Sequence, residues 1–141
     1  MDVTVPSSWT QVESPEFAVA YVGPREDDFR STFAVSTDTF DPPTPERLGA
    51  ILAGIRAGQA AEYDGFELLA EREDEVDGLY AWVEHYRWTP PAPTPPMTQL
   101  LALLVVQPGH LVKVDGVCLT ARADTDLPVL DGMVRSLRFD G

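Results

Sequence analysis

The chain has 141 residues, of which 44% are hydrophobic, and its formal net charge at pH 7 is −13. A chain of this length and composition fits one compact domain over 1–141 that buries about two-thirds of its unfolded surface. The negative charge repels phosphate backbones and anionic lipid, which argues against nucleic acid as a partner. The single cysteine, Cys118, excludes an internal disulfide, and its apolar neighbours are typical of a buried side chain.

Three segments in the first forty residues have the pattern of strands. They occupy residues 9–12, 16–22 and 29–37, and in the second of them aromatic and branched residues alternate with alanine. A polar stretch at 23–28 separates the last two segments and predicts a turn.

A helix is predicted over 45–62. Thr44 is a good N-cap, Pro45 fits a first helical turn, and Glu46 complements the helix dipole. Apolar residues then recur at helical spacing and predict a stripe that packs on a sheet: Leu48, Ile51, Leu52 and Ile55.

Segments 66–72 and 79–89 predict a β-hairpin with an acidic tip at 73–78. Its second arm carries Tyr80, Trp82, Glu84, Tyr86 and Trp88 on one face, and such an aromatic stripe either fills a core or lines a binding groove. Because a carboxylate is seldom buried without a partner, Glu84 keeps the groove interpretation open. The candidate partner- or ligand-binding residues are therefore Trp88, Tyr86, Glu84 and Tyr80. Of these, we expect Trp88 at the margin of the sheet.

The remaining segments complete an α+β pattern. The prolines at 90–96 predict a stiff spanning loop, which leads into an apolar strand at 100–106, a reversal at 107–110 and a second strand at 111–121. Apolar spacing after Asp124 predicts a last helix near 125–137, in which Pro128 is tolerable only in the first turn. We expect an αβα sandwich whose mainly antiparallel sheet of about six strands is covered by the two helices.

The order of short landmarks resembles the PsbP-like αβα sandwich family. These landmarks lie at 5–9, 29–33, 98–100, 117–121 and 134–139. The family includes Ran-binding nuclear import factors, photosystem accessory proteins, LpqN-type actinobacterial proteins and DcrB-like chaperones. Members of this family are mostly non-catalytic, so the resemblance implies a protein that binds other proteins or small ligands.

No motif for a catalytic, cofactor or metal site stands out in the sequence. Carboxylates from Glu73 to Glu84 occupy several ligand positions of an EF-hand-like calcium loop, but the flanking segments alternate as strands and not as helices. His85 and His110 lie at no metal-ligand spacing from Cys118. We therefore expect no metal, no cofactor and no enzymatic activity.

The leading hypothesis is a non-enzymatic binding or adaptor protein, whose most specific form is a chaperone for a secreted protein. The alternatives are a carrier of a small apolar ligand, held between the sheet and the first helix, and an enzyme whose site assembles only in space. The N-terminus lacks a basic and apolar leader, so with Met1 as the natural start we expect a cytoplasmic protein, without a membrane span, that is a monomer or homodimer. With an artificial start, an exported precursor is the alternative.

Overall fold

The computed structural model describes residues 1–26, 29–39, 45–107 and 109–139. One antiparallel sheet has the strand order β1-β2-β3-β7-β6-β5-β4. The strands are β1 (Thr10–Val12), β2 (Val19–Glu26), β3 (Phe29–Thr39), β4 (Glu67–Val76), β5 (Leu79–Trp88), β6 (Met97–Gln107) and β7 (His110–Leu119). The α+β class is confirmed, but this sheet has seven strands rather than about six, because even the short β1 pairs with β2 along its whole length.

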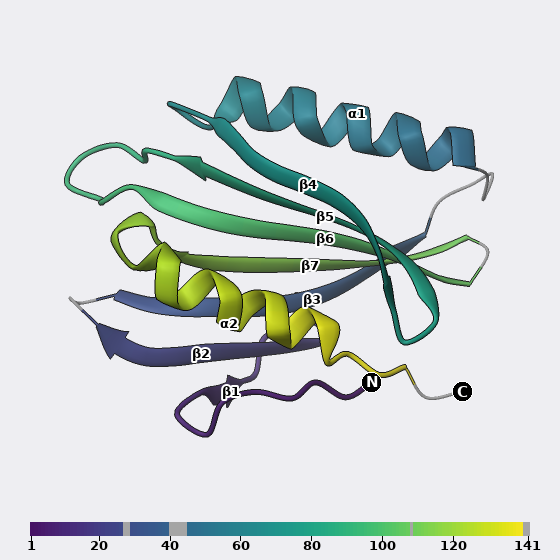
Figure 1. Ribbon diagram of the computed structural model, residues 1–141, viewed down its shortest axis with the longest axis horizontal. Coiled ribbons are helices and arrows are strands. Elements are labelled where there is room, and N and C mark those ends of the chain that lie inside the picture. The colour runs from purple at the N-terminus through teal and green to yellow at the C-terminus, as the bar shows by residue number, and fades with distance from the viewer. Residues whose placement is uncertain (27–28, 40–44, 108, 140–141) are drawn as a thin grey trace.

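The described residues form two α-helices. Helix α2 crosses one face of the sheet, and α1 runs along its β4 side (Figure 1). Helix α1 (Pro45–Glu62) has the predicted bounds, although its expected N-cap, Thr44, lies outside the described residues. Helix α2 (Ala123–Arg135) follows a 3-10 turn, η1 (Thr120–Arg122), and so begins earlier than predicted. Pro128 is therefore inside α2, beyond the first turn in which we expected it.

Each face of the sheet contributes to a separate apolar cluster. Phe33, Val35, Val83 and Leu100 pack with α2 residues such as Leu130. Trp82, Tyr86 and Leu101 lie on the other face and pack with Ile51, Leu52 and Ile55 of α1. Residues 100–104 of β6 are at most 2% exposed, so the prediction of a central strand covered on both faces is confirmed.

Two predicted turns are shorter in the structure. Strand β4 continues to Val76, so the acidic residues from Glu73 onward belong to a strand and not to the tip. Only Asp77 and Gly78 form the reversal, with φ of 52° and 77°, as a two-residue hairpin turn requires. Strand β2 likewise continues to Glu26 through an irregularity after Val22.

A bridge joins the two end segments of the described chain, and the single cysteine is buried. Asp2 and Arg138 pair as an isolated antiparallel bridge, which places the first residues of the chain beside the segment that follows α2. Cys118 is fully buried, and burial together with the nearby Asp126 carboxylate raises the pKa of its thiol to about 12. The prediction of a small buried side chain is confirmed. Among the described helices, none combines the length and apolar character that a membrane crossing requires.

Candidate functional site

Strand β4 is the outer edge of the sheet next to β5, and its exposed side chains form a mostly acidic surface. The edge surface, as we name it, consists of Glu67, Leu69, Glu71, Glu73 and Glu75 of β4 and Tyr80 of β5. Leu69 and Tyr80 are 43% and 39% exposed, and Leu69 lies at a bulge between Leu68 and Ala70. Edge strands with free backbone groups can accept a further strand, so this surface is a candidate partner site.

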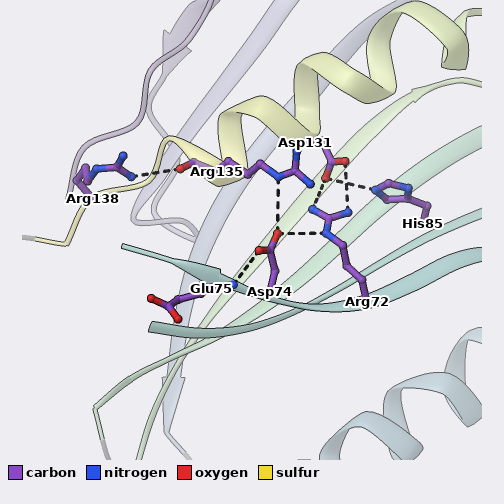
Figure 2. A network of polar contacts seen from close by, with 7 residues as sticks. All are labelled: Arg72, Asp74, Glu75, His85, Asp131, Arg135 and Arg138. Carbon is purple, nitrogen blue, oxygen red and sulfur yellow. Dashed lines mark hydrogen bonds and ion pairs between the residues drawn. The ribbon is translucent and has the colours of Figure 1, made fainter. Parts of the chain in front are cut away.

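A polar network attaches the other side of β4 to α2 (Figure 2). The α2 network consists of Arg72, Asp74, His85, Asp131 and Arg135. Arg72 donates to both carboxylate oxygens of Asp131, with distances of 2.9 Å from Nη2 to Oδ1 and 3.3 Å from Nη1 to Oδ2. His85 Nε2 lies 3.4 Å from Asp131 Oδ1, and Arg135 Nε lies 3.6 Å from Asp74 Oδ2. A two-pronged contact of this kind positions β4 more firmly than a single ion pair.

The electrostatics of the α2 network favour the ionised carboxylates. Burial raises the pKa of Asp131, but hydrogen bonds from His85 and Arg72 outweigh it and bring the pKa to about 2. A hydrogen bond from the backbone N–H of Glu75 lowers the pKa of Asp74. Burial lowers the pKa of Arg72, yet its bonds to Asp131 raise it overall. The carboxylates of Asp74 and Asp131 and the guanidinium of Arg72 are therefore charged at neutral pH.

Helix α1 holds β4 from the opposite face. Arg56 forms an ion pair with Glu71, and its guanidinium lies 5.7 Å from the ring centre of Trp82. Both partners of the ion pair are more than 40% exposed, so the pair contributes about 1 kcal/mol or less to stability. Its effect is to fix the position of β4 beside α1.

Beneath α1 lies an incompletely bonded polar group. Glu84 is 1% exposed, and its Oε1 accepts a hydrogen bond of 2.5 Å from Gln59 Nε2. Arg56 Nη2 lies 3.6 Å from Glu84 Oε2. Within the described part of the chain, Glu84 Oε2, Gln59 Oε1 and Arg56 Nε are buried without a hydrogen bond. Burial raises the pKa of Glu84, because the nearby donors do not fully replace water.

A cavity of about 170 Å³ opens beside this group, between α1 and the sheet. Its walls include Gly58, Gln59, Tyr63, Tyr86, Lys113 and Asp115. Of the apolar stripe expected to line a pocket here, Ile55 borders this cavity, while Ile51 and Leu52 pack on the aromatic cluster. The side chain of Leu48 lies outside the described residues. The cavity is therefore more polar than the pocket that the helix stripe predicts.

The four residues that the sequence proposed for binding all lie on β5 but differ in exposure. Tyr80 belongs to the edge surface, while Glu84 and Tyr86 are 1% and 2% exposed beneath α1. Trp88 is half-buried at the end of β5, where its ring stacks on Tyr63 at 4.6 Å between centres. Tyr80 is therefore open to a protein partner, whereas Tyr86 borders the cavity.

Sequence reasoning did not find the polar partners of β4 and β5. Arg72 and Asp131 are 59 residues apart, and Gln59 and Glu84 are 25 apart, so no local spacing reports either contact. The one usable signal was Glu84, a carboxylate in the middle of an aromatic stripe. It indicated a polar partner but not which one.

The polar contacts of His85 do not form a catalytic triad among the described residues. His85 and Asp131 resemble two members of a catalytic triad, but in the described residues the bonds of Asp131 go to Arg72 and His85, and no serine or cysteine bonds to His85. No group of histidine, cysteine, aspartate and glutamate in the described ranges could hold a metal ion. The carboxylates of the calcium-loop pattern are divided among β4, the turn residue Asp77 and the buried Glu84.

Solved structures share this fold at low sequence identity. No family model and no curated protein matches the sequence. LpqN of Mycobacterium tuberculosis, described as involved in cell envelope biogenesis, is 15% identical, with a TM-score of 0.70 over 94% of this chain and 79% of LpqN. Cyanobacterial PsbP (CyanoP) of Synechocystis sp. PCC 6803 is 20% identical, with a TM-score of 0.66 over 96% and 84%. The Ran-binding protein Mog1p of Saccharomyces cerevisiae is 16% identical, with a TM-score of 0.59 over 95% and 87%. The chain thus has the fold shared by PsbP and Mog1 proteins.

Proposed function

We propose that this chain, which has the PsbP and Mog1 fold, is a non-enzymatic binding or adaptor protein of the cytoplasm. Its β4 edge receives an extended, basic segment of a protein partner as an added strand. Among its structural neighbours, Mog1p is named for binding the protein Ran, which is the kind of role we propose here. The most specific form of the proposal is a chaperone or accessory factor for a secreted or assembled protein.

The observation that carries the proposal is the length and charge of the β4 edge. Strand β4 has ten residues, whereas β1 at the opposite edge has three. Four of the ten are exposed glutamates: Glu67, Glu71, Glu73 and Glu75. Glu67 and Glu71 already pair with Arg87 and Arg56, so the charge that a partner strand meets comes mainly from Glu73 and Glu75. Pairing of two copies of β4 would bring these like charges together, whereas a strand with lysine or arginine would neutralise them. The edge therefore selects a basic partner over a second copy of itself.

The edge is also held in place before a partner arrives. Arg72 links β4 to α2 through Asp131, and Arg56 links it to α1 through Glu71. A strand that is already fixed loses little conformational entropy when another strand adds to it, so more of the interaction energy remains for binding. Tyr80, beside Glu75 in the register of β4 and β5, supplies an exposed aromatic contact at one end.

Matched charge reversals can test the proposal in a pull-down from native lysate with mass spectrometry. One variant carries Glu73→Lys and Glu75→Lys on the edge surface. The control carries Glu13→Lys and Glu16→Lys, which are exposed near β1 and change the net charge of −13 by the same amount. We expect the wild type and the control to capture a partner that the β4 variant loses. Equal capture by both variants would refute a binding role for this edge.

Hydrogen exchange then distinguishes strand addition from docking through side chains alone. An added strand protects backbone amides of 67–76 that point away from β5, whereas side-chain docking leaves them in exchange with water. We expect protection of these amides by the captured partner and none at β1. Capture without protection of 67–76 would keep a binding function but overturn its proposed geometry.

A further inference from the structure

We infer that the cavity beneath α1 is a binding site for a small organic cation, namely a protonated amine whose apolar body is about the size of a benzene ring. This site shares no residue with the edge surface and is independent of the partner proposed above. The geometry, an incompletely bonded amide and the local charge each point to this class of ligand.

The cavity has room for such a ligand. Its volume of about 170 Å³ is close to the roughly 150 Å³ of an engineered cavity that takes up benzene. Ile55 and Leu101 provide apolar walls. Gly54 and Gly58 form part of the α1 wall, and a Cβ at either position would meet no atom within 4 Å. The missing side chains therefore leave the space open.

One hydrogen-bond acceptor in the wall of the cavity has no donor. Gln59 lines the cavity and is 7% exposed, and its Nε2 is engaged by Glu84. Its Oε1 is buried and has no hydrogen-bond partner among the described residues. A buried acceptor without a donor is unfavourable, and an ammonium group supplies three N–H donors and no competing acceptor. The unsatisfied amide oxygen thus favours a ligand rich in donors.

The charge around the cavity favours a positive ligand. Glu62 and Asp115 line it, opposed by Lys113, whose Nζ lies 3.9 Å from Asp115 Oδ2. Burial raises the pKa of Asp115 by more than Lys113 lowers it, so that carboxylate is incompletely compensated. Glu84 adds a further carboxyl group behind Gln59. A second cation beside Asp115 and Gln59 would stabilise these groups.

Aromatic rings complete the site. The rings of Tyr63 and Tyr86 stack with centres 5.7 Å apart and an angle of 13°, and both residues border the cavity. The Tyr86 hydroxyl donates to Gln99 Oε1, and burial, Tyr63 and nearby acids such as Asp115 raise its pKa, so the ring stays neutral. Neutral aromatic faces attract ammonium groups more strongly than they attract alcohols or carboxylates.

A titration with three probes of the same shape tests the charge preference. Benzylammonium, benzyl alcohol and benzoate are added to ¹⁵N-labelled protein at pH 7 in phosphate buffer, because Tris is itself an organic cation. We expect saturable shifts for benzylammonium at the amides of 54–63 and 113–115, and affinities at least about tenfold lower for the other two probes. Equal binding of the alcohol, tighter binding of benzoate, or no saturable shift in these segments would overturn the inference.

Three variants locate the bound probe. Gly58→Leu fills the cavity from α1, whereas Gly49→Leu introduces the same side chain on the same helix outside it. Both changes favour helix, so both proteins should fold. Of the two glycine variants, only Gly58→Leu should weaken benzylammonium binding, by about tenfold or more. Asp115→Asn should weaken benzylammonium but not benzyl alcohol. Wild-type affinity in both Gly58→Leu and Asp115→Asn would place the probe elsewhere and refute the site.

Discussion

Replacing Asp131 by asparagine should destabilise the protein at neutral pH and remove part of its sensitivity to acid. The change keeps the size of the side chain but removes the charge that Arg72 and His85 contact. The asparagine side chain therefore imitates the protonated carboxyl group. The comparison isolates what ionisation of this residue contributes to the α2 network.

The magnitude follows from the pKa of Asp131, which is about 2 in the folded chain against an ordinary value of 3.8. A difference of about 1.8 units at 1.36 kcal/mol per unit corresponds to about 2 kcal/mol. Because the folded pKa is depressed, this stabilisation is complete well above pH 4 and is lost as the pH falls through about 2. Between pH 6 and pH 3 the wild type should lose about 1 kcal/mol of it.

Urea unfolding at pH 6 and pH 3 measures the effect. We expect Asp131→Asn to be about 2 kcal/mol less stable than the wild type at pH 6 and about 1 kcal/mol less stable at pH 3. Asp124→Asn, an exposed aspartate in the first turn of the same helix, serves as the control and should leave the difference between the two pH values nearly unchanged. A destabilisation by Asp131→Asn that is equal at both pH values would show that its carboxylate is not held ionised by Arg72 and His85.

Three further substitutions test the aromatic stripe and its buried acid. Trp88→Ala should lower the free energy of unfolding by about 1–2 kcal/mol, since Trp88 is half-buried and stacks on Tyr63. Trp82→Ala should lower it by about 3–5 kcal/mol, because Trp82 is 7% exposed. Chemical denaturation compares the two variants, and equal losses of stability would place both rings in the core. Burial raises the pKa of Glu84 above its ordinary 4.5, so the wild type should lose stability as the pH rises from that value through the folded pKa, and Glu84→Gln should lose less. Unfolding at pH 5 and pH 8 measures this, and a larger loss in the variant would contradict the cause assigned to the shift.

The spacing of apolar residues predicted the local elements because each side of a helix or strand repeats with a fixed period. The bounds of α1 and the alternation along β5 needed no tertiary information, and Trp82, Tyr86 and Trp88 of β5 pack in one cluster as expected. Turn bounds were less accurate. Polar residues such as Glu73 suit both a turn and the exposed side of an edge strand, so only the pairing of Glu73 with Trp82 distinguishes the two.

The sequence by itself determined the α+β class, the helix over 45–62 and the burial of Cys118, because each follows from residues that are close in the chain. Tertiary structure decided that β4 forms an edge, that Arg72 meets Asp131, and that Gln59 meets Glu84 beside a cavity. Strand order sets which distant side chains become neighbours, and a carboxylate carries no local mark of the arginine or amide that will face it. The two candidate binding sites depend on those neighbours, so they became visible only in the folded chain.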